Sequence, residues 1–350
     1  MTDRPLVLVD PAPQDVSVIF TPQAWAELRS RFEVVEVDAS TAEGQRVFDE
    51  LLPNAFAVIG QPDLPAARLH RAGRLRVLCN VEGNFFPNVD YAACHEQGVY
   101  VLGCGPAYAQ AVAEYALGLA IDLARGISRE DRAFREGRER YTRGANQDAV
   151  LLRHSDVGFV GFGNLGRSLV ALLRPFAPRI RVYDPWIPVG TLRDADVEPA
   201  TLEQVLGQST FVFVLAAVTD DNQRLLDGDR LDLVRPGARL VLVSRAALVD
   251  FAALYERVRA GRFLAAVDVW PQEPMPPDDP ARSLEGLVLS AHRAGGIDAA
   301  FHAIGDMVVE DLVQVASGLP PMRMQVAARE LVHRYRSRPV DPRSPAPTGS

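Results

Sequence analysis

Short runs of β-branched and aliphatic residues alternate with amphipathic stretches along most of the chain. Such alternation is typical of parallel sheets covered by helices, so we expect an α/β fold. One series of strands fills the first hundred residues, and a second series begins after Asp156. The predicted strands are Leu6–Val9, Val34–Val37, Phe56–Ile59, Val77–Cys79 and Val99–Leu102, then Val157–Val160, Ile180–Tyr183, Phe211–Leu215, Leu240–Val243, Leu264–Val267 and Leu287–Leu289.

Two long amphipathic stretches are placed to connect these series of strands. Ala109–Arg125 has apolar residues at helical spacing, and a helix of this length often carries the chain between domains. Asp298–Ala316 is predicted to be a closing helix that returns to the first domain. We therefore expect one domain of residues 1–105 with 299–330, and another of residues 106–298. Arg125–Arg143 is interpreted as a solvated or subunit-interface helix, and Ser337–Ser350 as a disordered tail.

Composition narrows the function classes. A length of 350 residues allows two domains, and 48% hydrophobic with 23% charged residues is ordinary for a soluble globular protein. A net charge of -8 argues against nucleic acid as a partner. The N-terminus has no signal-peptide pattern and the apolar runs are short, so we expect a cytoplasmic protein without a membrane partner.

Two residue types limit the chemistry. All 37 basic residues other than histidine are arginine, which excludes a Walker A lysine, a pyridoxal Schiff base and a lysine aldolase. The three cysteines form no Cys-x-x-Cys pair, so neither a disulfide framework nor a thiolate zinc site is supported, and we expect no metal.

A glycine-rich turn predicts a dinucleotide site. The strand Val157–Val160 runs directly into Gly161-Phe162-Gly163-Asn164-Leu165-Gly166, and a helical stretch follows. Gly161 allows the tight turn, Gly163 lets the backbone approach the pyrophosphate, and Gly166 permits close helix–strand packing. The amides of Asn164 and Leu165 present the positive end of the helix to the phosphates.

An acidic residue selects between the two dinucleotides. Asp184 ends the next strand, eighteen residues after Gly166. A carboxylate at this position accepts hydrogen bonds from the adenosine ribose and repels a 2′-phosphate. The sequence therefore predicts NAD as the cofactor in preference to NADP.

Three ionisable residues follow strands of the second series. Arg245 ends the run Leu240–Ser244, Glu273 lies in the turn-rich segment Asp268–Pro274, and His292 follows Leu287–Ser290. Residues just beyond the carboxyl ends of parallel strands face the ligand crevice, so the three can converge there. Taken one at a time, each also fits a structural role: a surface arginine, a turn acid and a strand-end histidine.

The chain resembles the D-isomer-specific 2-hydroxyacid dehydrogenase family as far as about Leu319. The resemblance is carried by the glycine-rich turn and by four further segments whose order and spacing fit. These are Ala113–Leu117, Ser244–Asp250, Val267–Pro274 and Ala291–Gly295. The resemblance implies two Rossmann-like, doubly wound domains, with the active site in a cleft between them and the NAD-binding domain within residues 106–298. It also implies a homodimer.

The resemblance assigns the catalytic roles to Arg245, Glu273 and His292. His292 would exchange the proton of the C2 hydroxyl while hydride moves between C2 and the nicotinamide. Glu273 would orient the imidazole and favour its protonated form, and Arg245 would hold the substrate carboxylate and the C2 oxygen. Asp268 is expected to contact the nicotinamide carboxamide. The substrate would be a small D-2-hydroxy acid or the matching 2-keto acid.

A loop of the first domain is similar to the family's substrate loop. It comprises Asn80-Val81-Glu82-Gly83-Asn84-Phe85, directly after the strand Val77–Cys79. Amides of Glu82, Gly83 and Asn84 would bind the substrate carboxylate, with Gly83 permitting close approach. A plain strand–helix turn is the competing interpretation.

The sequence departs from the family pattern at three places. Ala216-Ala217-Val218 stands where a His-x-Pro element is frequent, Leu242 replaces an asparagine, and Arg245-Ala246 replaces an Arg-Gly pair. The three catalytic positions are unaffected. The departures leave open the detail of the cofactor pocket and the preferred substrate.

Three alternatives remain open at this point. The first is an NAD(H)-sensing scaffold like the corepressors of the same family. The second is a formate-oxidising relative, which Glu273 disfavours because those enzymes pair their histidine with glutamine. The third is a dehydrogenase that acts on a phosphonate analogue of a 2-keto acid, since both anions accept the same hydrogen bonds.

Overall fold

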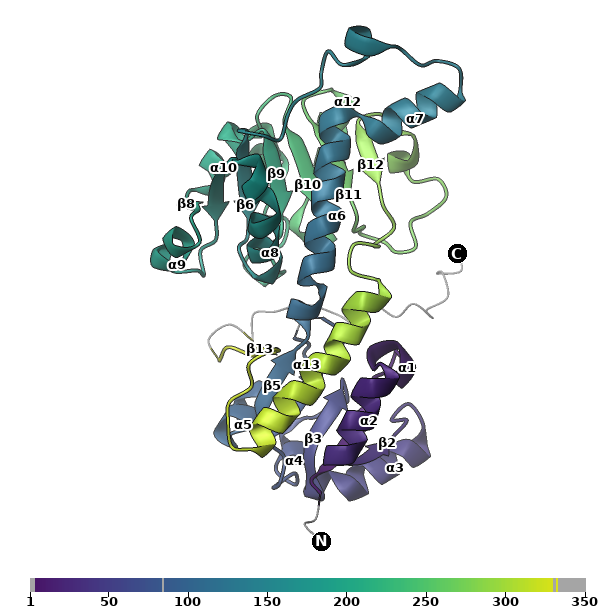
Figure 1. The fold of residues 1–350 in the computed structure, drawn as a ribbon, viewed down its shortest axis with the longest axis vertical. Helices are drawn as coiled ribbons and strands as arrows, with labels where there is room; N and C mark the ends of the chain where they lie inside the picture. Colours follow the sequence, from purple (N-terminus) through teal and green to yellow (C-terminus); the bar gives the residue numbers. More distant parts are fainter. Residues whose placement is uncertain (1–3, 84, 330–331, 333–350) are drawn as a thin grey trace. The chain divides into compact units, whose positions relative to one another are not determined.

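The computed structural model describes residues 4–83, 85–329 and 332, and the chain divides into two compact units. The first unit contains Met1–Tyr108, Thr219–Asp221 and Gly296–Ser350, and the second contains Ala109–Val218 and Asn222–Gly295. Each unit has its own sheet flanked by helices (Figure 1). The predicted α/β architecture with two Rossmann-like sheets is confirmed. The predicted tail Ser337–Ser350 lies outside the described residues.

The first unit is built on a six-stranded sheet. Its first five strands follow the predicted runs to within a residue, because continuous aliphatic runs favour extended backbone buried on both faces. The strands are β1 (Leu6–Asp10), β2 (Glu33–Glu36), β3 (Ala55–Gly60), β4 (Val77–Asn80), β5 (Tyr100–Gly103) and β13 (Gln325–Val326). The helices are α1 (Val16–Ile19), α2 (Pro22–Arg31), α3 (Ala42–Leu51), α4 (Ala66–Leu69), α5 (Tyr91–Glu96) and α13 (Asp298–Ala316), with a 3₁₀ turn at Leu52–Asn54.

The order of this sheet is β13-β5-β4-β3-β1-β2, and β1 to β5 pair in parallel. The order is that of flavodoxin-like folds. Side chains alternate between two cores: Val7 and Val9 pack with α2 and α13, whereas Leu8 packs with Phe48 of α3. The one deviation from the expected parallel sheet is β13, which pairs antiparallel with β5 and is too short to have a sequence pattern of its own.

The second unit is built on a seven-stranded parallel sheet of order β12-β11-β10-β9-β6-β7-β8. The order reverses between β6 and β9, and this switch point is where doubly wound sheets bind ligands. The strands are β6 (Asp156–Val160), β7 (Arg179–Tyr183), β8 (Glu198–Pro199), β9 (Phe211–Val214), β10 (Arg239–Leu242), β11 (Leu264–Val267) and β12 (Leu287–Leu289).

The helices of the second unit cover both faces of this sheet (Figure 1). The helix α6 (Gly105–Arg125) begins in the first unit and continues into the second. The α-helical part of the predicted Arg125–Arg143 segment is limited to α7 (Ile127–Arg135), which has no buried residue. The others are α8 (Asn164–Leu173), α9 (Val189–Asp194), α10 (Leu202–Gln208), α11 (Gly228–Asp232) and α12 (Phe251–Arg259), with 3₁₀ turns at Thr142–Ala145, Arg174–Phe176, Ala246–Leu248 and Pro280–Ser283.

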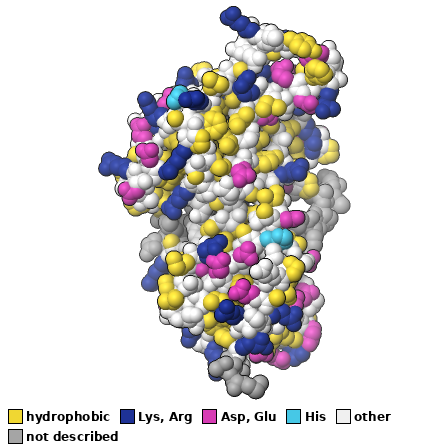
Figure 2. Space-filling model, viewed as in Figure 1, with side chains coloured by type: hydrophobic (Ala, Val, Ile, Leu, Met, Phe, Trp, Pro, Cys, Tyr) yellow, Lys and Arg dark blue, Asp and Glu magenta, His cyan; other side chains and the backbone are white. Residues whose placement is uncertain are grey.

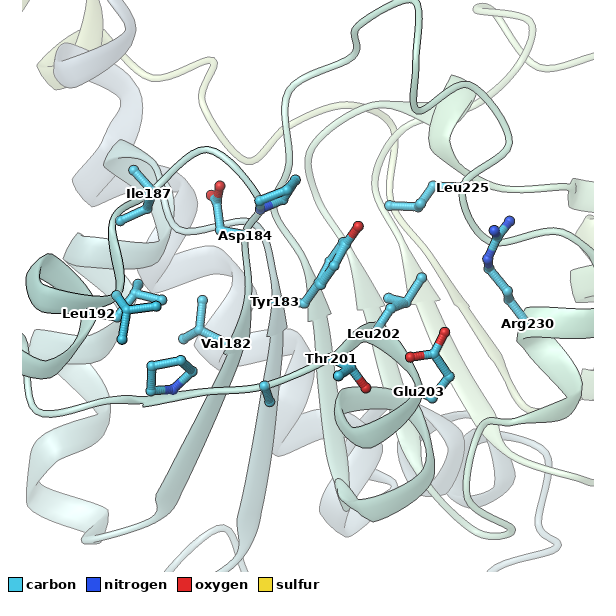
Figure 3. Close-up of a pocket in the computed structure, with 14 residues that line it drawn as sticks. Val182, Tyr183, Asp184, Ile187, Leu192, Thr201, Leu202, Glu203, Leu225 and Arg230 are labelled. Carbon is cyan, nitrogen blue, oxygen red and sulfur yellow. The ribbon is translucent and has the colours of Figure 1, made fainter.

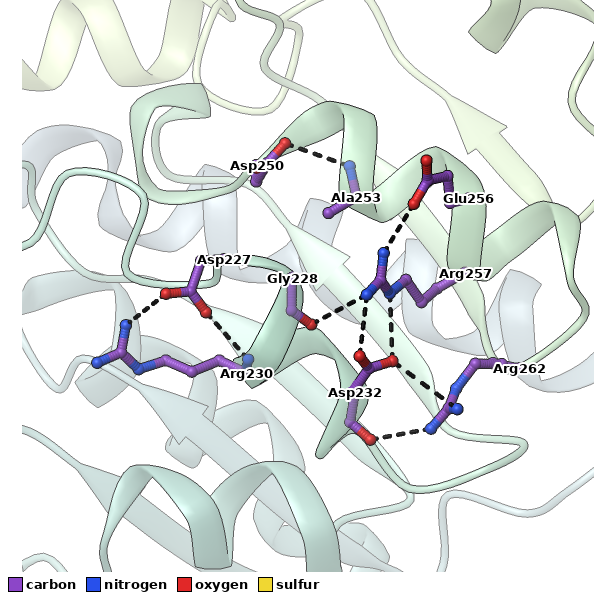
Figure 4. Close-up of polar contacts among 9 residues, drawn as sticks. All are labelled: Asp227, Gly228, Arg230, Asp232, Asp250, Ala253, Glu256, Arg257 and Arg262. Carbon is purple, nitrogen blue, oxygen red and sulfur yellow. Dashed lines mark hydrogen bonds and ion pairs between the residues drawn. The ribbon is translucent and has the colours of Figure 1, made fainter.

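Because the chain has no lysine, arginine forms the ion pairs that the two residue types would otherwise share. Arg257 of α12 donates to Asp232 of α11 at 2.9 Å and to the carbonyl of Gly228 at 3.3 Å (Figure 4). Arg262 donates to the carbonyl of Asp232 at 2.9 Å. The Arg257 hydrogen bond holds the pKa of Asp232 below its usual range. The planar guanidinium has several donors, so one arginine can bridge two helices.

Charges of both signs are interspersed on the face that Figure 2 shows. This mixture agrees with the net charge of -8. No helix within the described residues combines the length and apolar character needed to cross a membrane. Among the same residues, no group of three or more His, Cys, Asp and Glu side chains is arranged to hold a metal ion.

Candidate active site

The turn between β6 and α8 lies at the switch point of the second sheet. Gly161 has φ +97°, a conformation that favours glycine, and a Cβ there would lie 2.6 Å from the Ala216 backbone after β9. A Cβ on Gly166 would lie 3.1 Å from the ring of Phe162, so this glycine brings α8 close to the turn. Both glycines are therefore needed by the fold itself.

Gly163 differs from its two neighbours in the motif. It has φ -75°, and a Cβ built on it meets nothing within 4 Å. The open space at Gly163 lies where the turn meets the amino end of α8, whose first residues are Asn164 and Leu165. The first amides of a helix have no partner within it and favour anions. This cradle fits the pyrophosphate of a dinucleotide.

Asp184 lies at the end of β7, next to the glycine turn. Its two carboxylate oxygens accept hydrogen bonds from the amides of Phe162, at 2.7 Å, and Trp186, at 2.9 Å. Asp184, the residue predicted to bind the ribose, is thus held against the turn by its bond to the Phe162 amide. The same bond orders the turn. The sequence pattern predicted the position of this acid but did not predict its bond to Phe162.

A pocket of about 360 Å³ opens beside Asp184 (Figure 3). It is formed by the ends of β7 and β8 and the residues that follow them, together with Leu225 and Arg230. Its walls mix apolar side chains with Asp184 and Thr201. An apolar pocket with a few polar groups at its rim suits the adenosine half of a dinucleotide. The glycine cradle, Asp184 and this pocket together fit NAD.

His292 and Glu273 form a close pair in the same unit, where Glu273 follows β11 and His292 follows β12. His292 Nδ1 lies 2.7 Å from Glu273 Oε2, and both side chains are 29% exposed. The second carboxylate oxygen of Glu273 accepts from the Trp270 amide at 2.8 Å. The carboxylate is thereby fixed, and Nε2 of the imidazole is left for a partner outside the pair. This arrangement suits general acid–base chemistry.

The pKa of Glu273 lies below its ordinary value. Burial raises this pKa, but the hydrogen bonds from His292 and the Trp270 amide lower it by more, and the charges of His292 and Arg245 lower it further. Glu273 is therefore a carboxylate at neutral pH, and Arg245 is near enough to act on it electrostatically. The structure thus pairs His292 with Glu273 and places Arg245 within electrostatic range of Glu273.

Arg245 connects β10 to the turn Ala246–Leu248. Its backbone is extended, with φ -148° and ψ 137°, and its guanidinium donates to the carbonyl of Ser244 at 2.7 Å. A guanidinium carries five donors in a planar fork, so one arginine can bind several acceptors at once. Arg245 can therefore hold an anionic ligand while it keeps its own backbone contact.

The histidine lies in a constrained loop. His292 has φ +51°, an uncommon backbone conformation for a residue with a side chain, which costs about 1–3 kcal/mol. The fully buried Asp268 holds the loop, because its carboxylate accepts from the amides of Arg293, at 2.9 Å, and Ala294, at 3.1 Å. Its main-chain carbonyl accepts from the His292 amide at 2.7 Å. The predicted contact of Asp268 with nicotinamide stays a prediction.

The predicted substrate loop belongs to the first unit. Gly83 has φ +99°, a Cβ there would meet nothing within 4 Å, and its amide donates to Cys104 Sγ at 2.9 Å. Glu82 accepts from Gln14 Nε2 at 3.0 Å. Asn84 lies outside the described residues. The loop is therefore open at Gly83, but its Gly83 amide is already engaged.

Sequence reasoning missed two polar contributors to the His292 loop. Ser290 donates to the Asp268 carboxylate, and its own oxygen lies 2.7 Å from the Tyr115 hydroxyl. The sequence pattern places Tyr115 at an apolar position of a long helix and within the family segment Ala113–Leu117, and neither assignment gives its hydroxyl a role. Ser290 stands at a strand end two residues before His292, and that position is the signal that could have identified it.

Comparison with known protein families identifies the second unit. Residues 117–294 match the model of the NAD-binding domain of D-isomer specific 2-hydroxyacid dehydrogenases. The matched segment contains the glycine turn, Asp184, Asp268 and the Arg245–Glu273–His292 group.

Relatives with assigned activities match most of this chain. A hydroxypyruvate reductase of Thermotoga maritima is 30% identical over 284 residues, which cover 80% of this chain and 90% of the relative. A D-3-phosphoglycerate dehydrogenase of Archaeoglobus fulgidus is 26% identical over 292 residues, 82% of this chain and 54% of the relative. The chain thus spans about half the length of that phosphoglycerate dehydrogenase.

Solved structures also match along nearly the whole chain. The crystal structure of a phosphoglycerate oxidoreductase from Rhizobium etli is 44% identical, with a TM-score of 0.84. The match covers 93% of this chain and 99% of that one. The similarity therefore includes the first unit, which the matched NAD-binding domain does not reach.

Proposed function

The chain belongs to the D-isomer specific 2-hydroxyacid dehydrogenase family, and from this premise we propose that it transfers hydride between NAD(H) and C2 of a small D-2-hydroxy or 2-keto acid. Membership makes it an NAD-binding oxidoreductase. The observation that carries the proposed chemistry is the 2.7 Å contact between His292 Nδ1 and Glu273 Oε2.

The proposed roles follow from the charges and hydrogen-bonding capacity of the three side chains. Bound NADH supplies the hydride. Arg245 binds the substrate carboxylate and polarises the C2 carbonyl, because its fork matches a pair of oxygens. His292 donates a proton from Nε2 to the C2 oxygen in reduction and accepts it in oxidation. Glu273 keeps Nδ1 protonated and fixes the orientation of the ring.

The proposed cofactor contacts lie on the glycine turn and at the end of β7. The amino end of α8, with Asn164 and Leu165, binds the pyrophosphate above Gly163. Asp184 binds the adenosine ribose and selects NAD over NADP. We also propose that Asp268 contributes to the nicotinamide side of the site, at least by fixing the loop of His292.

We assign the other substrate contacts to the first unit, within the proposed domain of residues 1–105 and 299–330. The amides of Glu82, Gly83 and Asn84 are the proposed carboxylate ligands. The open position at Gly83 supports this assignment. For the Gly83 amide to bind substrate, its bond to Cys104 has to be shared or replaced. Burial raises the pKa of Cys104 to about 12, so the sulfur is an uncharged thiol and a weak competitor.

The decisive experiment is an NADH-oxidation screen with glyoxylate, hydroxypyruvate, pyruvate, longer 2-keto acids and phosphonopyruvate. We expect turnover with at least one of the carboxylates. Tight NADH binding without turnover of any compound would instead support the NAD(H)-sensing scaffold. Turnover confined to phosphonopyruvate would make the phosphonate analogue the substrate, and NAD reduction by formate alone would support the formate-oxidising alternative.

Phosphoglycerate is a second candidate substrate. The 44% identity to the Rhizobium etli phosphoglycerate oxidoreductase favours it, and exposed Arg293, next to His292, adds a cation that can attract a phosphate. The test is oxidation of 3-phosphoglycerate with NAD. If this substrate is the right one, Arg293→Ala should raise its KM and leave the KM for glyoxylate unchanged.

We further propose a cytoplasmic homodimer. The exposed helix α7 supports a subunit contact, since Phe134 is 62% exposed and Ile127 is 57% exposed. Apolar side chains on an arginine-rich helix are a common feature of interfaces. Light scattering after gel filtration should give twice the chain mass of 38.2 kDa, and a monomer would contradict the proposal.

A further inference from the structure

We propose that Tyr115 of α6 is a positioning residue for His292, acting through Ser290 and Asp268. This inference rests on the proposed function for its kinetic consequences. Its geometric basis lies entirely within the second unit. The reaction itself leaves both hydroxyl groups without a role.

The first step of the argument is the direction of the hydrogen bonds. The Ser290 hydroxyl has a single proton, and it donates that proton to the Asp268 carboxylate. Ser290 Oγ can therefore only accept from Tyr115, whose hydroxyl oxygen lies 2.7 Å away. The chain of donors runs from Tyr115 through Ser290 to Asp268.

The second step is what Asp268 does with that support. Its carboxylate has no exposed surface, and it accepts from Ser290 Oγ and from the amides of Arg293 and Ala294. These amides follow His292 directly along the chain. Asp268 thus fixes residues on both sides of the histidine. Tyr115 in turn fixes Ser290, which is the partner of Asp268 on the amino-terminal side of His292.

The third step is why the loop needs to be held. His292 has a left-handed backbone, which persists only where surrounding contacts determine it. The Ser290 carbonyl accepts from Trp270 Nε1 at 2.7 Å, so the loop is held at its backbone and at its side chain. Loss of the Tyr115 bond weakens the side-chain anchor, since Ser290 keeps its bond to Asp268, and leaves the backbone anchor in place. We therefore expect a displaced imidazole and not an unfolded protein.

The test compares Tyr115→Phe with Tyr255→Phe as a matched control. Tyr255 lies in the same unit and donates to Asp279 at 3.4 Å, a bond that does not involve Ser290, Asp268 or His292. Tyr115→Phe should lower kcat about 10-fold, because small misplacements of a catalytic group are costly. KM and the NADH Kd should stay near wild type, and Tyr255→Phe should leave all three unchanged. An unchanged kcat in Tyr115→Phe would overturn the proposal.

Two further variants separate positioning from general stability. Ser290→Thr retains the hydroxyl and should retain kcat, whereas Ser290→Ala should lower kcat to the level of Tyr115→Phe. The double variant Tyr115→Phe with Ser290→Ala should be no slower than Ser290→Ala alone, because both act through one chain. Losses that multiply would contradict the shared pathway.

Amide hydrogen exchange gives a readout that does not depend on turnover. Exchange at the amides of Arg293 and Ala294 should be faster in Tyr115→Phe than in wild type, with no change in Tyr255→Phe. If the wild-type protein turns over no 2-keto acid, the proposed function fails and the exchange result still decides the positioning of the loop. Equal exchange in Tyr115→Phe and wild type would overturn the inference.

Discussion

The two units share one architecture but differ at their switch points. In the second unit, β6 is followed by Gly161–Gly166 and a helix of ten residues begins at Asn164. In the first unit, β1 is followed by Pro11-Ala12-Pro13, and the next helix, α1, has only four residues. Proline has no amide donor, so the turn after β1 cannot offer a phosphate the same row of N–H groups as the turn after β6. Similar sheets therefore support different ligands through the turn that follows one strand.

The same comparison extends to glycines packed against backbone. Gly161 of the second unit and Gly60 of the first both have positive φ, +97° and +132°, and at both a Cβ would collide with the neighbouring strand end. At Gly163, by contrast, the Cβ position is open. Gly161 and Gly60 are therefore required for close backbone packing, whereas the space beside Gly163 is available to a ligand.

The largest expected effect in this comparison concerns His292, the proposed proton donor, which lies in the second unit. His292→Ala should lower turnover about 10²- to 10⁴-fold, the usual contribution of a general acid. NADH binding should stay near normal, since the glycine turn holds the cofactor. Turnover close to wild type would remove His292 from its proposed role, and steady-state kinetics with fluorescence titration of NADH measure both quantities.

Substitution of the three glycines by alanine tests the comparison directly. Gly161→Ala should lower both the melting temperature and NADH affinity, because the strained backbone and the contact with Ala216 disturb the turn. Gly60→Ala should lower the melting temperature only. Gly163→Ala should have the melting temperature of wild type. It should bind NADH at least 10-fold more weakly, which corresponds to a loss of about 1.4 kcal/mol of binding free energy.

Thermal unfolding and NADH titration of all three glycine variants are sufficient for this test. A Gly163→Ala protein with wild-type NADH affinity would contradict the phosphate cradle. A Gly60→Ala protein that loses NADH affinity would show that the first unit takes part in cofactor binding.

A smaller effect is expected at Asp184. Asp184→Ala should weaken NAD binding and reduce the discrimination against NADP, because the ribose ligand and the repelling charge are both removed. The bond from the Phe162 amide is lost as well, so a moderate fall in melting temperature should accompany the change. Kd values for NADH and NADPH measure the selectivity, and an unchanged NADH Kd would refute the ribose assignment.

The smallest effect is the pH dependence of the Glu273–His292 pair. The pKa of Glu273 is lowered in the folded protein relative to the ordinary value of about 4.3. The ionised carboxylate therefore stabilises the fold above that pH, and this contribution is lost as pH falls through the lowered pKa. Denaturant unfolding should show a stability difference between wild type and Glu273→Gln at pH 6 that shrinks toward pH 3. A constant difference would contradict the shift.

Much of the architecture could be predicted because it depends on periodicity. The β-branched runs gave every strand of four or more residues to within a residue at most ends, and the glycine turn was recognisable from its context between a strand and a helix. The strands β8 and β13 were missed because two residues carry no period.

The candidate site could be predicted only in part, because long-range contacts are not encoded locally. The strand-end positions of Arg245, Glu273 and His292 follow from topology, and the structure pairs His292 with Glu273 and leaves Arg245 within electrostatic range. The bond between Tyr115 and Ser290 joins residues 175 positions apart, and the engaged amide of Gly83 depends on Cys104 from the next strand. Neither contact has a sequence pattern.

The measurement that tests the central claim most directly is transfer of deuterium from [4,4-²H₂]NADH, which is labelled at both C4 positions, to a 2-keto acid under single-turnover conditions. Wild-type protein should place the deuterium on C2 of a D-configured 2-hydroxy acid, and His292→Ala should bind the same NADH without transferring it at a comparable rate. A product without deuterium at C2, or one of L configuration, would contradict the account.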